Sequence, residues 1–281
     1  MKINLINYEL GLGIDGILTK YTDKMDYWLR ELGHETIITN QPDDKADVFH
    51  HINYLPYKKG DGVNTLMITH LLDNKDKIDK LKGNMETADM GICFSKDMEG
   101  QLGEYLPKDK LTTILPAHDS LQRRLKVIAI TTRVYPDGCK REGMFKELCK
   151  VIDKDKFGFR IMGRGWKDIV QEVGAAGFTN IEYFEEFDST IYKHILDSSD
   201  YYLYFGLDEG SMGTLDAIQC GLKIITTPQG FHKQLPIDHP FETQEELNEI
   251  FKKLEENPVE GLTWENYCNQ HIKIWEDLLT K

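Results

Sequence analysis

The chain has 281 residues, of which 40% are hydrophobic and 29% are charged, a composition typical of a soluble globular protein with a buried core. At about 150 residues per domain, this length predicts two domains. The formal net charge is −13, and basic residues form only short clusters such as Lys58-Lys59 and Arg123-Arg124-Lys126. Binding of nucleic acid is therefore disfavoured, because it usually requires a basic patch or stripe.

The cysteines and the apolar segments predict the cellular compartment of the protein. The five cysteines include no C-x-x-C pair and their number is odd, so we expect reduced thiols rather than a disulfide framework. The apolar stretch at the N-terminus is too short and too interrupted for a signal peptide. No segment approaches the ~20 apolar residues of a membrane span. We expect a cytoplasmic protein, either free or peripheral at the inner face of the membrane.

Short apolar segments alternate with amphipathic segments in the first part of the chain. Strands are predicted at residues 3–6, 36–39, 48–54, 66–69, 90–94 and 111–115. A helix is predicted over residues 15–32, where apolar residues recur at helical spacing and Gly33 follows as a C-terminal cap. A second helix follows Ser95, a favourable N-cap, and runs through Leu106. Residues 116–124 are polar and aperiodic, which indicates a linker.

The same alternation resumes after the linker. Strands are predicted at residues 127–131, 157–162, 201–205 and 223–226, and helices at 141–152, 166–176, 188–196, 212–220, 244–256 and 264–279. Such alternation is typical of parallel α/β architecture. We therefore predict two Rossmann-like domains facing across a cleft, residues 1–118 and 119–260. The final helix, in residues 261–281, is expected to pack back towards the first domain.

One loop after a predicted strand combines glycines with carboxylates. Asp208 and Asp216 flank the small-residue loop Gly210-Ser211-Met212-Gly213, which opens a helix. The free N–H groups at the start of a helix bind anions, and glycines let a ligand approach the backbone closely. The two carboxylates can accept hydrogen bonds from sugar or ribose hydroxyls. This pattern predicts a site for a phosphorylated polyol.

Other loops at the carboxyl ends of strands add basic residues and glycines. Arg133 and Lys140 follow the strand at 127–131, and both side chains suit phosphate; Arg141 is the alternative to Lys140. Gly163-Arg164-Gly165 follows the strand at 157–162. The segment from Gly11 to Gly16 reads G-x-G-x-x-G, a dinucleotide fingerprint, although Asp43 and Asp44 lie late for the acid that this fingerprint requires.

The segment from Leu215 to Gly221, LDAIQCG, resembles the donor-binding signature of retaining GT-B glycosyltransferases of group 1, similar to family 4. The resemblance implies transfer of a sugar from a nucleoside diphosphate sugar, such as a UDP- or GDP-sugar, to an acceptor hydroxyl. It makes Asp216 similar to the acid that holds the ribose and Asp208 similar to the acid at the donor hexose, with Glu209 as the alternative there. Both positions are usually Glu in the family.

The same resemblance implies roles for residues in the other loops. Arg133 and Lys140 match the positions that face the donor diphosphate, and Gly163 and Gly165 lie near the nucleobase, as does the backbone of residues 183–187. The loop with Gly11 and Gly13 approaches the donor phosphates and the acceptor, and His70 lies against the donor sugar. The family works without a bound metal or other cofactor. The acceptor is a sugar, a lipid-linked sugar or another hydroxyl compound, commonly in polysaccharide biosynthesis.

Three alternatives remain open at the level of sequence. A GT-B-fold sugar-nucleotide epimerase would bind the same class of donor. An NAD-dependent oxidoreductase would use the Gly11 loop, and a catalytically silent binding protein would bind the donor without turnover. The histidines, among them His50 and His51 within one strand, show no H-x-x-x-H or H-E-x-x-H spacing, so we expect no metal site.

Overall fold

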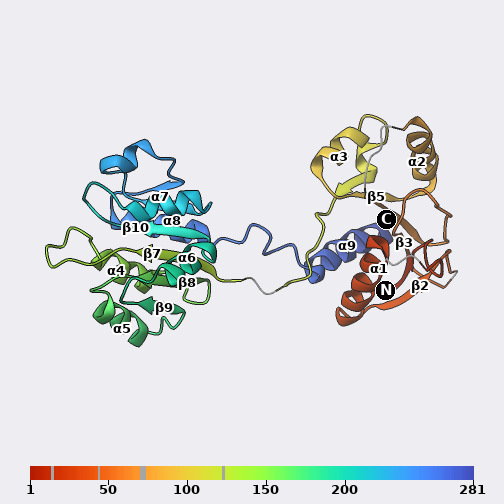
Figure 1. Cartoon of the computed structure of the whole chain (residues 1–281). Coiled ribbons are helices and arrows are strands. Elements are labelled where there is room, and N and C mark those ends of the chain that lie inside the picture. Colours follow the sequence, from red (N-terminus) through yellow and green to blue (C-terminus); the bar gives the residue numbers. More distant parts are fainter. Residues whose placement is uncertain (14–15, 44, 70–73, 122–123) are drawn as a thin grey trace. The chain divides into compact units, whose positions relative to one another are not determined.

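The computed structural model describes residues 1–13, 16–43, 45–69, 74–121 and 124–281. The chain divides into two compact units (Figure 1). Unit 1 comprises Met1–Leu121 together with Pro258–Lys281, and unit 2 comprises Gln122–Asn257. Unit 1 is therefore built from both ends of the chain, whereas unit 2 is one continuous segment.

Unit 1 contains a parallel six-stranded sheet in the order β2-β1-β3-β4-β5-β6 within the described residues. Its strands are β1 (Lys2–Ile6), β2 (Glu35–Thr39), β3 (Val48–His51), β4 (Val63–Ile68), β5 (Met90–Cys93) and β6 (Leu111–Thr113). Its helices are α1 (Ile17–Glu31), α2 (Lys75–Thr87), α3 (Lys96–Leu102), the 3-10 helix η1 (Lys108–Lys110) and α9 (Trp264–Leu279).

Unit 2 contains a second parallel six-stranded sheet, in the order β12-β11-β10-β7-β8-β9 within the described residues. Its strands are β7 (Lys126–Thr131), β8 (Phe157–Met162), β9 (Ile181–Phe184), β10 (Tyr201–Tyr204), β11 (Lys223–Thr226) and β12 (His239–Pro240). Its helices are α4 (Gly143–Val151), α5 (Lys167–Ala175), α6 (Ser189–Asp197), α7 (Met212–Gln219), the 3-10 helix η2 (Gly230–Gln234) and α8 (Gln244–Glu255).

The two sheets confirm the prediction of two Rossmann-like units. Numbered from its own first strand, the sheet of unit 2 reads 3-2-1-4-5-6 from β9 to β12, the order of dinucleotide-binding folds. Unit 1 begins 2-1-3, the order of flavodoxin-like folds. The order therefore reverses between β7 and β10 in unit 2 and between β1 and β3 in unit 1. Such a reversal is the usual place for a ligand in an open α/β sheet.

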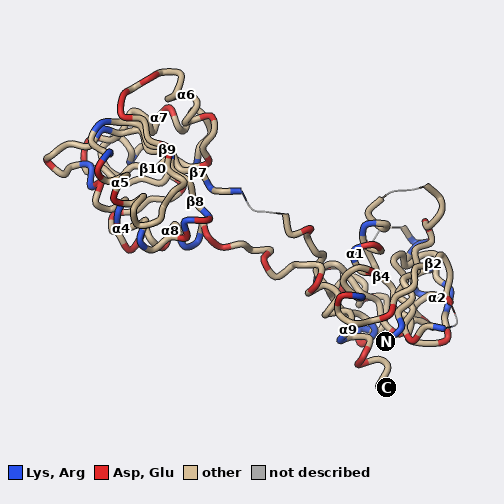
Figure 2. Tube along the Cα trace, turned by 90° about the horizontal axis from the view of Figure 1, so that it is seen from below, with Lys and Arg blue, Asp and Glu red and all other residues tan. Residues whose placement is uncertain are grey.

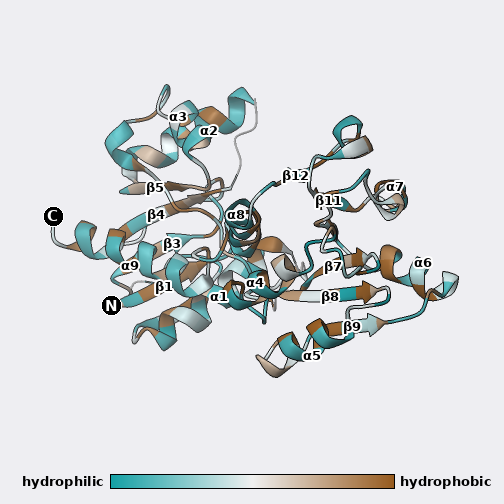
Figure 3. Ribbon diagram, turned by 90° about the vertical axis from the view of Figure 1, so that its left-hand side faces the viewer, coloured by the Kyte–Doolittle hydropathy of each residue, from teal (hydrophilic) through white to brown (hydrophobic). Residues whose placement is uncertain are grey.

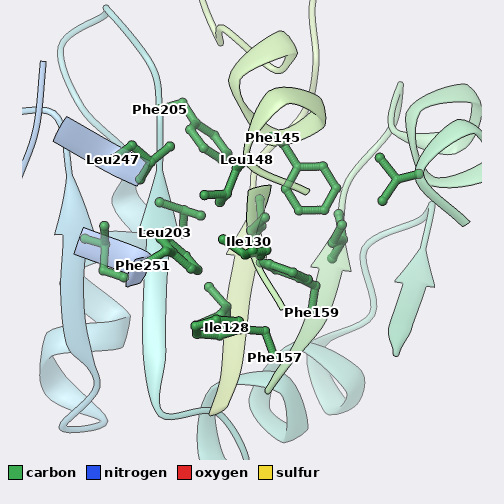
Figure 4. Close-up of a cluster of buried hydrophobic side chains, with 14 of the residues drawn as sticks. Ile128, Ile130, Phe145, Leu148, Phe157, Phe159, Leu203, Phe205, Leu247 and Phe251 are labelled. Atoms are coloured by element: carbon green, nitrogen blue, oxygen red, sulfur yellow. The ribbon is translucent and has the colours of Figure 1, made fainter. Parts of the chain in front are cut away.

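The strands are short, and the inner strands of each sheet are apolar and largely buried on both faces, as parallel sheets covered by helices require. All residues of β3, β4 and β10 are buried. Figure 3 shows apolar residues along the strands and mixed polar and apolar residues along the helices. In unit 2, Phe145 of α4 packs edge-on against Phe159 of β8 and Trp166, with ring centroids 4.9 and 5.7 Å apart (Figure 4).

Several elements differ from the prediction for local reasons. Helix α2 was not predicted, because its 13 residues bury only Leu81 and Met85; Asn74 caps it by accepting from the Lys77 N–H. Edge strand β9 was also missed, since none of its residues is fully buried. The helix that follows Ser95 ends at Leu102 rather than Leu106, and the strand that begins at Val48 ends at His51.

Helix α9 lies in the core of unit 1. Its residues Trp264, Tyr267 and Trp275 belong to the same buried cluster as Ile3 and Leu5 of β1. The segment before α9 also pairs with the segment that leaves unit 1, because the His118 N–H donates to the Leu262 carbonyl at 2.8 Å. Trp264 Nε1 donates to Asp119 at 3.0 Å, which fixes the start of the helix.

Charged residues are spread over both units. Acidic and basic residues are interspersed along the trace (Figure 2), so the excess of 47 acidic over 34 basic residues is not concentrated in one segment. Within the described part of the chain, no helix is both long enough and apolar enough to span a bilayer.

Three histidines are buried in unit 1 and held in the neutral form. His50 and His271 are fully buried, with ring centroids 5.0 Å apart, and His51 lies on the same strand as His50. Their Nε2 atoms have no hydrogen-bond partner in the described part of the chain. Burial lowers the pKa of His51 and of His271 to about 4, and burial together with the neighbouring histidines lowers the pKa of His50 well below its usual value. These histidines therefore stabilise unit 1 only while they are uncharged.

We predict that unit 1 loses stability below neutral pH and that His271→Phe reduces this loss. A histidine whose folded pKa is about 4 and whose unfolded pKa is 6.5 stabilises the fold above pH 6.5 and loses that contribution as the pH falls towards 4. The decrease in free energy of unfolding between pH 7 and pH 5 should be smaller by about 2 kcal/mol in the variant. Urea unfolding at both pH values measures it. His194→Gln, a change of an exposed histidine, should keep the wild-type pH dependence; an unchanged dependence in His271→Phe would contradict the prediction.

Candidate functional site

Two loops of unit 2 diverge at the carboxyl edge of the sheet. β7 and β10 are neighbours, with Ile128 opposite Tyr201 and Ala129 opposite Tyr202. The chain continues from β7 to β8 on one side and from β10 to β11 on the other. Loops that diverge from adjacent strands leave a crevice between them. The loops concerned are residues 132–142 and 205–211, which contain several of the predicted site residues, among them Arg133, Lys140 and Asp208.

A cavity of about 330 Å³ occupies this crevice. It is lined by Thr131, Thr132, Arg133, Met162, Gly163, Phe187, Tyr192, Met212, Gly213 and Asp216. The structure thus brings together five of the predicted site residues, from the loops after β7 and β8 and from helix α7. Arg133 and Asp216 provide the two charges of opposite sign on its wall.

Helix α7 begins at this cavity without a side-chain cap. Ser211 is the N-cap residue, but its hydroxyl lies 3.0 Å from the Tyr202 hydroxyl and caps no backbone N–H. Met212 and Gly213, the first two residues of the helix, line the cavity. The first N–H groups of a helix lack intrahelical acceptors and carry its positive partial charge, so this part of the wall is suited to an anion.

Gly213 allows α7 to lie close against the sheet. A Cβ at this position would lie 2.6 Å from Thr131 Oγ1 and would also overlap the Tyr202 hydroxyl. These two hydroxyl groups lie 3.0 Å apart and are hydrogen-bonded to each other. The absence of a side chain therefore places the start of α7 directly above β7 and β10.

Gly163 and Gly165 have different roles in the loop after β8. Gly163 lines the cavity with φ of +142°, and a Cβ there would overlap the Thr132 carbonyl group. Gly165 packs against Val134, and the Val134 N–H donates to the Arg164 carbonyl at 2.9 Å. Gly163 thus forms part of the wall, whereas Gly165 holds the neighbouring loop in place.

Arg133 is the basic side chain of the cavity. Its guanidinium lies 5.2 Å from the centre of the Tyr135 ring, a cation–π contact. It makes no hydrogen bond or ion pair with any described residue, in contrast to Arg164, which binds Glu186 through two nitrogens. The pKa of Glu186 is lowered by the hydrogen bond from Arg164 and, less strongly, by the charge of Arg133. The Arg133 charge is therefore available to an anionic ligand.

Asp216 is held by a tyrosine that the sequence did not reveal. Tyr192 of α6 donates a hydrogen bond of 2.6 Å from its hydroxyl to Asp216 Oδ2. Burial raises the pKa of Tyr192, and the hydrogen bond to the carboxylate raises it further. The Phe187 ring lies 5.5 Å from the Tyr192 ring and is 71% exposed. The cavity wall thus combines an oriented carboxylate with an exposed aromatic ring.

Lys140 and Asp208 bind each other and do not line the cavity. Lys140 Nζ forms an ion pair with Asp208, donates to the Tyr204 hydroxyl at 2.7 Å and is only 11% exposed in its side chain. Tyr204 also donates to Asp208. Partial burial tends to raise the pKa of Asp208, but the hydrogen bonds from Lys140 and Tyr204 outweigh it and lower this pKa. In this structure the two charges neutralise each other beside the cavity.

The remaining residues of these loops stabilise the backbone. Arg141 donates to the carbonyl groups of Phe205 and Glu242 at 2.8 and 2.9 Å. The Glu209 side chain is exposed, and its carbonyl accepts from the Phe231 N–H at 3.1 Å. Gly210 has φ of +115° and contacts Phe231. Arg141 and Glu209, the two alternatives from the sequence, therefore do not line the cavity.

The glycine-rich loop of unit 1 follows β1 as predicted. Gly11 and Gly13 both have positive φ, +83° and +69°, within turns in which the N–H groups of Leu10 and Leu12 donate to Asn7 and Glu9. β2 ends at Thr39, so no carboxylate stands at the position that a dinucleotide fingerprint requires. His70, Asp15 and Asp44 lie outside the described residues.

Unit 1 has its own cavity, of about 530 Å³, at the carboxyl ends of β1, β3, β4 and β5. It is lined by Glu9, Gly16, Ile17, Leu18, Tyr21, Asn53, Thr69 and Phe94. The wall combines aromatic rings with hydrogen-bonding side chains. In the described residues, no group of three or more His, Cys, Asp or Glu side chains is arranged to hold a metal ion.

Three residues of the site in unit 2 were not found from the sequence: Tyr192, Tyr204 and His232. The two tyrosines lie in segments that also read as ordinary core, and Phe187 was predicted only as part of the backbone of residues 183–187. In the strand YYLY, Tyr201 lies on one face and Tyr202 and Tyr204 lie on the other, and the sequence does not indicate which of these hydroxyl groups reaches the loops. His232 follows β11, and only the folded structure brings it to Ser211.

No protein family model and no curated protein matches the sequence. Solved structures of glycosyltransferases do match it. A mutant of S. aureus TarM in complex with UDP and other ligands is 11% identical with a TM-score of 0.40, and the match covers 92% of this chain and 58% of TarM. WaaG, a glycosyltransferase involved in lipopolysaccharide biosynthesis, is 11% identical with a TM-score of 0.40, over 100% of this chain and 98% of WaaG.

A glycosyltransferase from Rickettsia africae is 12% identical with a TM-score of 0.40, and the match covers 100% of this chain and 99% of that enzyme. This chain thus spans less than two thirds of TarM and nearly all of the other two. Identities and TM-scores this low do not establish a common function.

We predict that Gly213→Ala destabilises unit 2. The new methyl group would overlap Thr131 Oγ1 and the Tyr202 hydroxyl, and overpacking of this kind costs about 1–3 kcal/mol. Urea unfolding followed by circular dichroism measures the change. Gly174→Ala is the matched control in α5, because its methyl group would meet no atom within 4 Å; it should gain about 0.5–1 kcal/mol. Equal stability of the two variants would show that α7 does not lie as close to the sheet as described.

Proposed function

We propose that the chain is a GT-B-type glycosyltransferase that binds the nucleoside diphosphate part of a sugar donor in the cavity of unit 2. The observation that carries this proposal is the combination found in one cavity: a guanidinium that pairs with no acid among the described residues, the start of α7 without a side-chain cap, and an oriented carboxylate. A diphosphate needs the first two, and a ribose needs the third. The cavity volume of about 330 Å³ lies within the range of ~300–1,000 Å³ of small-molecule sites.

The positions of these groups suggest one orientation for the donor. The diphosphate would lie between Arg133 and the first residues of α7, where both the full and the partial positive charges are found. The ribose hydroxyls would donate to Asp216, whose carboxylate is already fixed by Tyr192. The base would then lie against the exposed Phe187 ring, since aromatic faces stack on nucleobases.

The proposed chemistry is electrostatic. When the bond between sugar and diphosphate breaks, negative charge develops on the leaving diphosphate, and preorganised donors stabilise it. Arg133 and α7 would supply this stabilisation, and we propose that the reaction needs no metal ion. Lys140 could add its charge only by giving up its ion pair with Asp208. Retention of anomeric configuration rests on the resemblance of the LDAIQCG segment to retaining enzymes.

We propose that the acceptor binds to unit 1. The cavity at the carboxyl edge of its sheet offers Glu9, Asn53 and Thr69 for hydroxyl groups and Tyr21 and Phe94 for an apolar face. These features suit a sugar, a lipid-linked sugar or another hydroxyl compound. We further propose that the protein works in the cytoplasm or at the inner face of the membrane, where nucleotide sugars are available.

We predict that Arg133→Ala weakens binding of UDP or GDP about 10- to 100-fold, because hydrogen bonds to charged groups contribute about 1.5–3 kcal/mol. Lys140→Ala should weaken binding less, since its charge is already neutralised by Asp208. Isothermal titration calorimetry measures both. Arg124→Ala is the control, because this exposed arginine pairs with Asp200 beyond the amino end of β10. A larger loss in Lys140→Ala than in Arg133→Ala would contradict the proposed position of the diphosphate.

We also predict that Asp216 recognises the ribose. The wild type should bind UDP more tightly than its 2′,3′-dideoxy analogue, by about tenfold, because the analogue leaves the carboxylate without its partners. Asp216→Ala should bind both nucleotides with the same affinity. If Asp216→Ala kept the preference of the wild type, another residue would hold the ribose.

Product analysis separates the proposal from its rivals. Incubation with a nucleotide sugar and added acceptors should give a glycosylated acceptor, in the presence of EDTA as well. An isomerised donor would indicate an epimerase. Tight binding of NAD without an effect of UDP or GDP would indicate an oxidoreductase, and binding of a nucleotide sugar without any product would indicate a silent binding protein.

A further inference from the structure

We infer that His232 is a positioning residue that holds the loop of residues 206–211 and the start of α7 in the geometry that binds the donor. This inference rests on the proposed function, because it assigns a role at the same site. His232 lies in η2, after β11, and is completely buried. It is not among the residues that line the cavity of unit 2, so in the proposed complex it would not touch the ligand.

Both ring nitrogens of His232 have defined partners. Nδ1 lies 3.3 Å from the Thr227 carbonyl oxygen and 3.2 Å from Thr226 Oγ1. A carbonyl oxygen can only accept, so Nδ1 carries the proton and donates. Nε2 is then unprotonated and accepts a hydrogen bond of 3.0 Å from the Ser211 N–H. The contacts therefore select one neutral tautomer of the imidazole.

The hydrogen bond from the Ser211 N–H affects the start of α7, because Ser211 is the N-cap residue of this helix. The N-cap residue determines how the chain enters the helix and where its first N–H groups lie. The Ser211 side chain is engaged with Tyr202 and gives the helix no cap. The start of α7 thus has no side-chain cap of its own, and the imidazole of His232 holds it through the Ser211 N–H.

His232 also contacts the other side of the loop. Its ring packs edge-on against Tyr204, with centroids 5.4 Å apart, and Tyr204 hydrogen-bonds both Lys140 and Asp208. One imidazole therefore supports the start of α7 and the charged group beside the cavity. Loss of its acceptor should loosen the loop without changing any ligand-contacting side chain.

The segments around His232 and the loop interlock closely. Thr227 Oγ1 donates to the Gly206 carbonyl at 2.6 Å, and the Phe231 N–H donates to the Glu209 carbonyl at 3.1 Å. A Cβ at Gly210 would lie 3.0 Å from the His232 ring and closer still to Phe231. Contacts thus hold the loop along its length, and His232 provides the hydrogen bond next to α7.

Two amide substitutions separate this role from simple packing. The terminal amide of glutamine reaches the position of the imidazole Nε2, whereas the shorter asparagine amide reaches only that of Nδ1. His232→Gln can therefore still accept from Ser211, and His232→Asn cannot. Both replace the ring by a smaller amide side chain, so a role in packing alone would loosen the loop in both variants, with only the small difference that one methylene group makes.

The experiment compares the wild type, His232→Gln and His232→Asn by amide hydrogen exchange and by calorimetry with UDP and GDP. We expect His232→Asn to exchange faster over residues 206–214 and to bind the better of the two nucleotides about tenfold more weakly. We expect His232→Gln to stay within about threefold of the wild type in both measurements. Equal behaviour of the two variants, or unchanged exchange in His232→Asn, would overturn the inference.

Two further outcomes keep the inference separate from the proposed function and from misfolding. If the wild type bound neither nucleotide, the proposed function would fail, but the exchange comparison needs no ligand and would still decide whether His232 holds the loop. If a variant did not fold, the wild type labelled with 15N at histidine would be decisive. Its spectrum should show the Nδ1–H tautomer for His232, and an Nε2–H tautomer would overturn the inference.

Discussion

The site of unit 2 depends on the pairing of β7 with β10. These strands are neighbours in space but not in sequence, and the chain leaves them in opposite directions across the sheet. Without this pairing, Arg133 and the start of α7 would not lie on one cavity. The close approach of α7, made possible by Gly213, then brings the helix start to the level of the strand ends. The topology of the sheet thus determines which loops meet at the site, and the side chains of those loops then determine its chemistry.

The distribution of charge within the site is uneven. Lys140 and Asp208 form an ion pair in which the lysine is mostly buried and the aspartate partly exposed, and Tyr204 hydrogen-bonds both of them. Arg133 has no such partner in the described part of the chain, and Asp216 has only the uncharged Tyr192. The cavity therefore presents one positive and one negative group at different places. A ligand that carries phosphate at one end and hydroxyl groups further along would complement this arrangement, and the nucleoside diphosphate that we propose is such a ligand.

The sequence predicted the two Rossmann-like units and most of their elements because strongly apolar strands and amphipathic helices leave clear periodic signals. It missed α2 and β9 because both bury few residues. Within the site, it found residues that follow strands closely, such as Arg133 and Gly163, and the glycine at the start of the next helix, Gly213. It did not find Tyr192 or His232, because their importance arises from contacts with Asp216 and Ser211, 24 and 21 positions away. Nor did it indicate that Lys140 and Asp208 neutralise each other, since that depends on the fold of a loop.

The placement of α9 has a consequence for synthesis on the ribosome. Unit 2 is a continuous segment that lies between the two parts of unit 1. Domains generally fold as units while the chain emerges, so unit 2 has all its residues available earlier. Unit 1, although its sheet is translated first, lacks Trp264, Tyr267 and Trp275 until the last helix leaves the exit tunnel. During that interval the apolar residues of unit 1 that pack against α9 in the finished protein lack this partner, so the core of unit 1 is completed after all of unit 2 has been synthesised.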